Sequence, residues 1–392
     1  MDVNRPGQII IYKKRVNHAR VDSLVVLWII EGMKKEEISV SAPGRICLFG
    51  EHQDYFGLPI IAAAINLRIF INGRPREDHR VRIELPDLGE EEEFSLEGAL
   101  PYRQERDYLR SAVNVLRRKG VRFECGWDCI LRGTIPINAG TSSSSALVVA
   151  WNKFLLEAVH NGVLNNPEEI AELGFLTEVA EFHEPGGKMD HYASAIGGIV
   201  NVTFEGGLQV KRLKNPLKTF VLADSLQKKD TTGMLGYIKE HVLDGVAFIR
   251  RNLKGFSLYS PIGPRERDEM KKLPEDNRRL LEGTLMTRDL TKDGKELFQE
   301  NDFDHVQFGR LLTRQHEVLR DYLRTSTPKI EKMMDAALNA GAYGGKLNGS
   351  GGGGCMFVYA PDGTEQIATA IEGTGAKVHI IHVDQGVRKE AE

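Results

Sequence analysis

The stretch SAPGRICLFGEHQDY, Ser41 to Tyr55, decides how the first part of this chain is built. An alternating segment, Ile38 to Ala42, leads into it, and an apolar run, Ile60 to Ile71, follows it. We interpret both flanks as β-strands, with a turn at APGR and a polar loop between them. Fixed donors and acceptors in one short loop suit a polyol, because each hydroxyl needs a partner to replace water. The candidate side chains, which singly would be ordinary surface charges, are Arg45, Glu51, His52 and Asp54.

The composition is that of a globular protein large enough for two domains. The chain has 392 residues, of which 41% are hydrophobic and 27% charged, and its formal net charge is -3. This balance excludes a disordered or fibrous chain and argues against nucleic-acid binding, which favours a clustered basic face. No run of roughly 18 apolar residues is present, so we expect no membrane-spanning helix. The four cysteines are too sparse for a disulfide framework and lack metal-ligand spacing, which favours reduced thiols in a cytoplasmic protein.

Residues 1–35 are expected to form an N-terminal extension. Their apolar core, Leu24 to Ile30, is too short for a membrane span. A secretory signal is disfavoured because Glu31 and Lys34 stand where small cleavage-site residues belong. Met33 begins MKKEEISVSAPGR, so we hypothesise that it is the natural start of the chain. An intact mass of the native protein that includes residues 1–32 would refute this hypothesis.

Predicted strands and helices alternate along the chain without strict βαβ order, which indicates a mixed α+β protein. We place the domain boundary near residue 205, giving one domain from 36 to 205 and another from 206 to 392. The acidic stretch Glu90 to Glu93 is interpreted as a solvated loop. Helices are predicted at 106–119, 145–160, 168–182, 234–249, 277–282, 311–324, 328–340 and 365–372, and further strands at 81–85, 123–131, 196–204, 219–223, 355–359 and 376–382.

A second motif, PINAGTSSSSA from Pro136 to Ala146, stands between a predicted strand and a strongly apolar predicted helix. Gly140 lets the backbone approach a ligand, and the unpaired amides and dipole of the first helical turn favour an anion. A helix cap needs one serine, so four in succession favour phosphate binding, with hydroxyls for phosphate oxygens or a magnesium ion. The segment is not a Walker A loop, because no Gly-Lys-Ser or Gly-Lys-Thr follows.

A third motif, KLNGSGGGGC from Lys346 to Cys355, has glycine at 349 and at 351–354. The alternative is a flexible linker, but linkers do not usually run directly into CMFVYA, which is typical of a buried strand. We therefore predict a wall of backbone packed against a ligand.

A fourth segment, EVAEFHEPGGKMDHYAS from Glu178 to Ser194, ends a predicted helix at Pro185. It places Gly186, Gly187 and Asp190 in a turn. An aspartate there is a candidate general base, although turn-forming aspartates are common, so the residues alone leave both roles open.

Together these segments closely resemble the GHMP small-molecule kinases, the family of galactokinase, homoserine kinase, mevalonate kinase and phosphomevalonate kinase. The resemblance covers roughly residues 38 to 385, with three motifs in matching order. GRICLFGEHQDY is similar to the galactokinase signature, and Glu178 to Asp190 resembles the galactokinase segment that ends in its catalytic aspartate. The resemblance implies an N-terminal domain like ribosomal protein S5 domain two, a C-terminal ferredoxin-like domain, and an active site in the cleft between them.

The resemblance also implies an ATP- and Mg²⁺-dependent kinase of a sugar or sugar-like polyol, acting on a hydroxyl such as the anomeric one, as a monomer or homodimer. Asp190 would be the base and Arg45 the cation near the transferring phosphoryl group, with magnesium held by Ser144 and Glu178. Sugar hydroxyls would contact Glu51, His52, Asp54, Gly187 and Tyr237. ATP would lie against Pro136, Asn138, Ala139, Gly140, Thr141, Ser142, Ser143, Ser144, Ser145, Gly349, Gly351 and Gly352.

The chain departs from galactokinases in ways that leave its substrate open. Cys47 replaces an asparagine, Gln53 replaces a threonine, and Lys188 and His191 flank Asp190. The third motif is closer to mevalonate kinases, so a mevalonate-type or cyclitol kinase is the alternative enzyme. A non-catalytic galactokinase-like sugar sensor is the alternative of another class. A sensor needs no base, so the joint presence of Arg45, Asp190, Ser144 and Glu178 argues against it.

Overall fold

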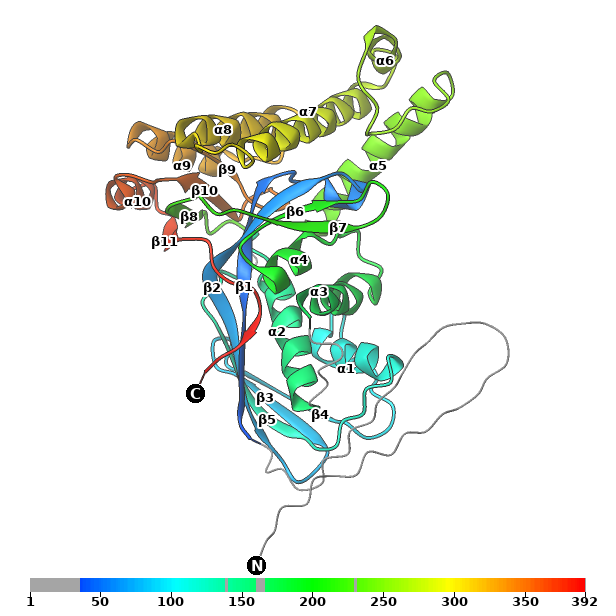
Figure 1. The fold of residues 1–392 in the computed structure, drawn as a ribbon, viewed down its shortest axis with the longest axis vertical. Helices are drawn as coiled ribbons and strands as arrows, with labels where there is room; N and C mark the ends of the chain where they lie inside the picture. Colours follow the sequence, from blue (N-terminus) through cyan, green and yellow to red (C-terminus); the bar gives the residue numbers. More distant parts are fainter. Residues whose placement is uncertain (1–35, 138–139, 160–165, 229–230, 392) are drawn as a thin grey trace, which may run out of the picture.

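The structure is a computed structural model that describes residues 36–137, 140–159, 166–228 and 231–391 (Figure 1). The predicted extension, Asn138 and Ala139 lie outside the described residues. Among those described, every helix is too short or too polar to span a bilayer. All four cysteines, Cys47, Cys125, Cys129 and Cys355, are buried and carry no disulfide.

The larger sheet forms the first domain, and within the described residues it has eight strands. Their order is β12-β1-β2-β5-β3-β4, with β6 paired to β2 and β7 to β6. Helices α1 to α4 cover one face of this sheet (Figure 1). The strands are β1 (Ile38–Phe49), β2 (Ile60–Pro75), β3 (Arg80–Leu85), β4 (Glu90–Ser95), β5 (Trp127–Gly133), β6 (Ile199–Thr203), β7 (Gln209–Leu213) and β12 (Arg388–Lys389). The helices are α1 (Tyr108–Arg118), α2 (Ser143–Ala158), α3 (Pro167–Phe175), the π-helical turn η3 (Leu176–Ala180) and α4 (Met189–Ile196).

Strand β1 runs straight through the APGR sequence, so the predicted turn is wrong. The register with β2 shifts between Pro43 and Arg45, which marks a β-bulge. Gly44 is required there, because a Cβ atom would lie 2.8 Å from the carbonyl oxygen of Thr141. The backbone N–H of Arg45 donates to the same carbonyl at 3.2 Å. The bulge therefore holds the serine-rich loop against the central strand.

The acidic stretch at 90–93 is strand β4, not the predicted loop. It pairs antiparallel with β3, and its carboxylates meet arginines across the strands. Arg80 pairs with Glu93, and Arg82 with Glu91 at 3.0 Å. These cross-strand pairs explain how four successive glutamates are accommodated at a sheet edge.

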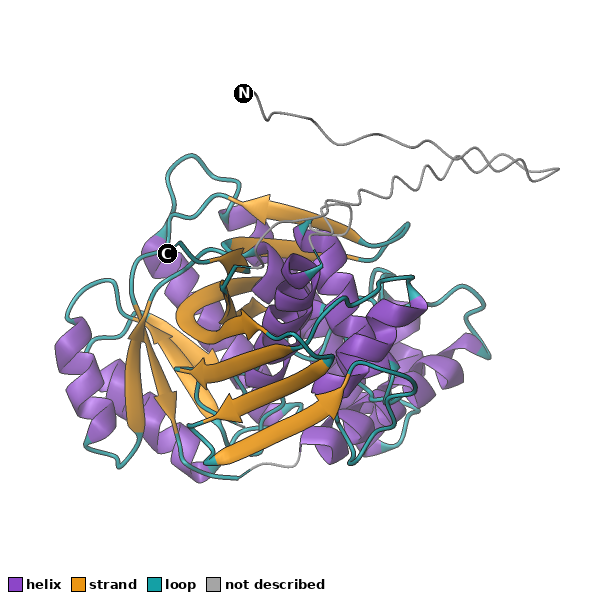
Figure 2. Cartoon of the chain, turned by 90° about the horizontal axis from the view of Figure 1, so that it is seen from below, coloured by secondary structure: helices purple, strands orange, loops and turns teal. Residues whose placement is uncertain are grey.

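The second domain contains a four-stranded antiparallel sheet in the order β11-β8-β10-β9, within the residues that the structure describes. Numbered along the chain, this is the order 4-1-3-2, which is ferredoxin-like, as predicted. Figure 2 shows the helices packed against the two sheets. The strands are β8 (Phe220–Asp224), β9 (Gly344–Leu347), β10 (Cys355–Tyr359) and β11 (Lys377–Ile381). The helices are α5 (Thr231–Arg250), α6 (Pro264–Met270), α7 (Glu275–Leu297), α8 (His305–Asp321), α9 (Pro328–Asn339) and α10 (Thr364–Glu372).

The first domain's sheet continues past the predicted boundary near residue 205. Strand β7 pairs with β6, and β12, from the end of the chain, pairs with β1. The buried Arg68 on β2 holds the C-terminal segment against this sheet. Its guanidinium donates to Asp384 Oδ2 at 2.8 Å and to the Gly386 carbonyl at 2.8 Å. The C-terminal segment is thus part of the first domain's structure.

Candidate active site

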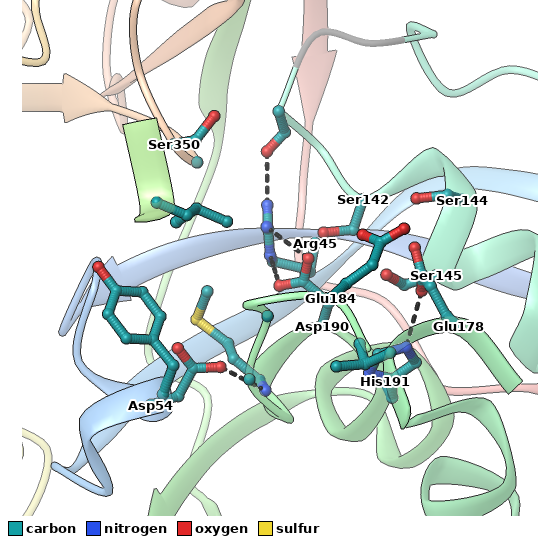
Figure 3. Close-up of a pocket in the computed structure, with 18 of the residues that line it drawn as sticks. Arg45, Asp54, Ser142, Ser144, Ser145, Glu178, Glu184, Asp190, His191 and Ser350 are labelled. Atoms are coloured by element: carbon teal, nitrogen blue, oxygen red, sulfur yellow. Dashed lines mark hydrogen bonds and ion pairs between the residues drawn. The ribbon is translucent and has the colours of Figure 1, made fainter. Parts of the chain in front are cut away.

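A pocket lies where the two domains meet, at the end of the β1 bulge (Figure 3). The first domain supplies the loop after β1, the start of α2, the turn η3 and the start of α4. The second domain supplies Leu235 on α5 and Gly349 and Ser350 of the glycine-rich loop. Three of the motifs singled out in the sequence, together with the fourth segment, therefore converge on one cavity.

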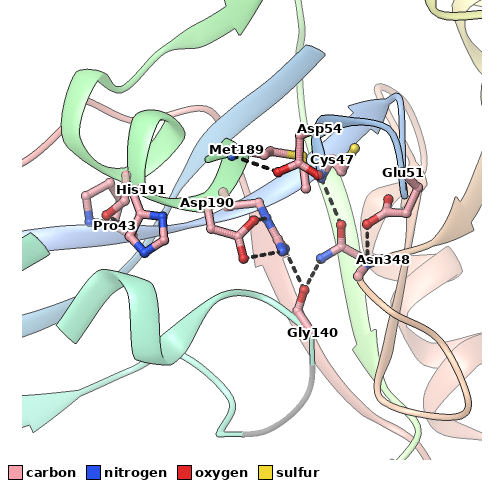
Figure 4. Close-up of polar contacts among 12 residues, drawn as sticks. Pro43, Cys47, Glu51, Asp54, Gly140, Met189, Asp190, His191 and Asn348 are labelled. Atoms are coloured by element: carbon pink, nitrogen blue, oxygen red, sulfur yellow. Dashed lines mark hydrogen bonds and ion pairs between the residues drawn. The ribbon is translucent and has the colours of Figure 1, made fainter. Parts of the chain in front are cut away.

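Arg45 and Asp190 form an ion pair at the centre of this pocket. Arg45 Nε lies 2.7 Å from Asp190 Oδ1, and Nη2 lies 2.9 Å from Oδ2, so the pairing is bidentate. The third nitrogen, Nη1, donates to the carbonyl of Gly140 at 2.6 Å (Figure 4). Burial alone would raise the pKa of Asp190, but the charge and hydrogen bonds of Arg45 outweigh it and lower that pKa. Asp190 is therefore ionised at neutral pH.

Asp54 lies on the other side of Asp190 from the serines (Figure 3). Its Oδ2 accepts a hydrogen bond from the Met189 backbone N–H at 3.0 Å. A Cβ atom on Gly187 would lie 2.0 Å from that oxygen, so only glycine allows the contact. Burial, and to a lesser extent the charge of Asp190, raises the pKa of Asp54 to about 6. The two neighbouring carboxylates thus differ in protonation behaviour.

The serine-rich loop leads into the N-terminus of α2, which points at the pocket. Ser142 occupies the N-cap position in the left-handed conformation, with φ of 60°, and its side chain makes no capping hydrogen bond to the helix. It lines the pocket together with Ser143, Ser144 and Ser145. Thr141 is buried, and its hydroxyl donates to the carbonyl of Pro136 at 3.4 Å, so both stabilise the loop from behind. Free amides at a helix start beside serine hydroxyls make an anion-binding surface.

Glu178 reaches the same side of the pocket from the π-helical turn η3. Its Oε2 lies 2.7 Å from Nε2 of the buried His191. The Glu178 carboxylate and the Ser144 hydroxyl are hard oxygen ligands of the kind that Mg²⁺ prefers, usually with substrate phosphates and water. Within the described residues, no three His, Cys, Asp or Glu side chains are grouped to hold a metal by themselves. The site therefore fits a Mg²⁺ that arrives with a nucleotide.

Glu51 and His52 line the pocket but are already engaged by protein groups. Glu51 is 1% exposed, with Oε2 2.5 Å from Lys346 Nζ and Oε1 accepting from the Gly349 N–H at 2.7 Å. His52 Nδ1 lies 2.9 Å from the Tyr55 hydroxyl. Their predicted contact with a substrate stays a prediction.

Five of the predicted ligand contacts that the structure describes lie outside the pocket lining: Pro136 and Thr141, which stabilise the serine-rich loop from behind, and Tyr237, Gly351 and Gly352. Tyr237, on the outer side of α5, is 40% exposed and stacks on His241 with ring centroids 4.1 Å apart. Gly351 packs against Thr325, whose carbonyl also accepts from the Gly352 N–H at 2.7 Å. Gly349 does line the pocket, but a Cβ there would lie 2.8 Å from the Gly140 carbonyl. The predicted glycine wall is thus packed largely against the chain itself.

The pocket also contains residues that sequence reasoning missed. Arg106 Nε pairs with Glu184 Oε1 at 2.6 Å, and Tyr108 lies beside them. The pairing joins segments 78 residues apart and has no local signature. Asn348 of the third motif lies outside the pocket lining but reaches it indirectly, because its Nδ2 donates to the carbonyl of Gly140 at 2.9 Å.

Three family models match the chain. The GHMP kinases N terminal domain matches residues 107–198, GHMP kinases C terminal matches 295–377, and the galactokinase galactose-binding signature matches 31–75. The chain is 30% identical to the mevalonate kinase of Thermococcus onnurineus (strain NA1), over 90% of this chain and 98% of that protein. It is 26% identical to the galactokinase of Haemophilus influenzae (strain ATCC 51907 / DSM 11121 / KW20 / Rd), over 90% and 94%.

The Lactococcus lactis galactokinase, solved in complex with galactose, has the same fold. Its TM-score is 0.77 at 21% identity, over 91% of this chain and 96% of that one. The chain belongs to the GHMP kinase family, and the predicted two-domain GHMP fold is confirmed. Its relatives include both galactokinases and mevalonate kinases.

Proposed function

We propose that this protein transfers the γ-phosphoryl group of ATP to a hydroxyl of a sugar or sugar-like polyol, with the anomeric hydroxyl as the favoured acceptor. One observation carries the proposal. An ionised Asp190, paired with Arg45, lies between a serine-lined helix start and a second carboxylate, Asp54. A phosphate surface, a cation, a proton acceptor and a hydroxyl-binding carboxylate meet in one pocket.

The chemistry asked of these residues is positioning and charge stabilisation. The acceptor hydroxyl attacks the γ-phosphorus, the bond to the β-phosphate oxygen breaks, ADP leaves, and the hydroxyl proton passes to Asp190. Asp190 is a weak base because Arg45 lowers its pKa. A weak base suffices when the transition state is loose, since the attacking oxygen keeps its proton until late. Arg45 and the α2 amides stabilise the phosphoryl oxygens.

Mg²⁺ held by Ser144 and Glu178 would neutralise negative charge on the phosphates when ATP is bound. His191 supports this arrangement because it fixes one oxygen of Glu178 at 2.7 Å. Partners of this kind orient a metal-binding side chain.

The charge of the acceptor side supports a neutral substrate. Asp54 is acidic, and the arginines that line the described pocket are both paired, Arg45 with Asp190 and Arg106 with Glu184. A carboxylate substrate such as mevalonate would have no unpaired arginine to bind and would meet Asp54. A neutral polyol can instead donate a hydrogen bond from one of its hydroxyls to that carboxylate.

A mevalonate-type kinase is the second candidate, supported by the 30% identity to a mevalonate kinase over nearly its full length. A cyclitol kinase or a sugar sensor is a further alternative. The sensor is disfavoured, because binding alone gives no reason to hold an ionised Asp190 beside Arg45.

An ATP-consumption screen tests the proposal across hexoses, uronic acids, amino sugars, inositols and mevalonate, with the Asp190→Asn variant as control. We expect turnover with at least one neutral sugar or polyol and none in the variant. Turnover with mevalonate alone would replace the sugar assignment. ADP binding without turnover on any acceptor would favour the sensor.

A further inference from the structure

Glu51 and Lys346 form a buried ion pair that joins the two domains. Glu51 follows β1 of the first domain, and Lys346 lies on β9 of the second. Their side chains are 1% and 0% exposed, and Lys346 Nζ lies 2.5 Å from Glu51 Oε2. Lys346 Nζ also donates to the Cys47 carbonyl at 2.8 Å, while Glu51 Oε1 accepts from the Gly349 N–H at 2.7 Å. Each charge therefore has a second partner besides the other.

Such burial is costly for a residue whose task is to bind a ligand. Charges withdrawn from water lose much of their solvation, and only close pairing with further hydrogen bonds offsets that loss. Both Glu51 oxygens are held by the second domain, one by a side chain and one by the backbone. The geometry is that of a fixed internal contact.

The contact is continuous with the catalytic pair through Asn348 (Figure 4). Asn348 Oδ1 accepts from the Cys47 N–H at 2.9 Å, and Nδ2 donates to the Gly140 carbonyl at 2.9 Å. That carbonyl also accepts from Arg45 Nη1 at 2.6 Å. The segment from Lys346 to Gly349 thus fixes the group that orients Arg45, and Gly349 packs directly on Gly140.

We propose that Glu51 is a positioning residue and not an acceptor-binding residue. With Lys346 it forms an interdomain clamp that holds Asn348 and Gly349 against Gly140. The clamp thereby fixes the position of the serine-rich loop and the orientation of the Arg45 side chain. Asp54 then carries acceptor recognition on this side of the pocket. The clamp rests on the proposed function only for its kinetic readout.

Three variants test the clamp: Glu51→Gln, Lys346→Met, and the double variant. Glutamine keeps an oxygen for the Gly349 N–H but leaves Lys346 as an unpaired buried cation. Methionine fills the lysine's space and leaves Glu51 unpaired. The double variant removes both charges and keeps the backbone hydrogen bond. Asp268→Asn with Lys271→Met is the matched control, because that pair is about 70% exposed on both sides.

We expect each single variant to lower Tm by roughly 5–10 °C, since breaking a buried pair leaves an uncompensated charge. By calorimetric titration, each should weaken ADP binding roughly tenfold, the size of a lost charge-assisted hydrogen bond. The acceptor KM should stay within about twofold, while kcat falls. The double variant should recover most of the Tm and the ADP affinity, and the control should change neither.

The clamp proposal is overturned if Glu51→Gln raises the acceptor KM while ADP affinity is unchanged. It is also overturned if adding Lys346→Met to Glu51→Gln restores neither the Tm nor the ADP affinity. These outcomes differ from failure of the proposed function. If the wild-type protein turns over no polyol, the recovery of Tm and of ADP affinity in the double variant still decides for or against the clamp.

Discussion

Two neighbouring carboxylates of this pocket have pKa values displaced in opposite directions. Arg45 lowers the pKa of Asp190, whereas burial raises that of Asp54 to about 6. Groups separated in this way commonly have different tasks in one site. Asp190 stays ionised and so is available to receive a proton, although weakly basic, whereas Asp54 is proposed to bind an acceptor hydroxyl.

Asp190→Ala and Asp190→Asn are expected to lower kcat for phosphoryl transfer by roughly 10²-fold or more, the usual effect of losing a general base. ADP affinity should change little, because the first-turn amides that would bind the phosphates belong to the backbone of α2 and not to Asp190. Turnover assays and ADP titration measure the two effects. Near-normal turnover in either variant would contradict the role of base. Because both substitutions leave the Arg45 charge without its partner, thermal unfolding of each variant checks that the protein is still folded.

Asp54→Asn is expected to stabilise the fold at pH 7 while raising the acceptor KM. The folded-state pKa of about 6 lies above the roughly 3.9 of an unfolded aspartate. Between about pH 4 and pH 6 the native state holds a proton that the unfolded state lacks, so stability falls as pH rises through that window. Removing the charge should restore about 3 kcal/mol at pH 7 and almost nothing at pH 4. Urea unfolding at both pH values checks this, and an equal gain at each would contradict it.

At the scale of elements, the site is assembled where short irregular segments interrupt regular ones. The β1 bulge, the π-helical turn η3 and the glycine pair before α4 each bring a side chain into the pocket. Bulges and π-helical turns are often found at functional sites for this reason.

Gly187→Ala should disrupt acceptor binding, because its Cβ would lie 2.0 Å from Asp54 Oδ2 and the carboxylate would have to move. A displacement of about 1 Å near the chemistry can cost 10²-fold in rate, so we expect kcat/KM for the acceptor to fall roughly that far. Gly186→Ala is the matched control, since its Cβ would meet Val179 at an ordinary 3.4 Å. Equal losses in the two variants would show that backbone freedom matters and the Asp54 contact does not.

Local sequence patterns predicted the regular elements and the order of the motifs. They failed where contacts with residues far away in the sequence determine the local structure. The APGR sequence carries turn residues, yet Thr141 and β2 hold it as a bulged strand. The four glutamates at 90–93 predicted a loop, but two of them pair across the strands, Glu93 with Arg80 and Glu91 with Arg82. At the site, Arg45, Asp54 and Asp190 were predicted to meet, and they do lie together. The partners of Glu51 were not predicted, because Lys346 is 295 residues away.

At the scale of the whole molecule, the two domains are joined through buried polar contacts. Besides the clamp, Gln53 Nε2 donates to the Thr284 carbonyl on α7 at 3.1 Å. The first domain in turn depends on the C-terminal segment, whose Asp384, Gln385 and Gly386 accept three hydrogen bonds from Arg68.

Deleting residues 384–392 is expected to destabilise the protein by about 3–5 kcal/mol, the usual effect of leaving a buried charge without its partner. Arg68 is 2% exposed, and its guanidinium would keep only its hydrogen bonds to Ser41. Urea unfolding measures the loss, and deletion of residues 391–392 alone serves as control. Equal stability of the two truncated proteins would contradict the role of this segment.

The pairing of β12 with β1 also fixes an order of events during synthesis. Strand β1 is made early, but the residues that neutralise Arg68 and cover Val40 and Ser41 follow β11, the last strand of the second domain's sheet, along the chain. The sheet of the first domain therefore cannot be completed while the second domain is still being synthesised. It must wait, partly assembled, until the second domain has been made.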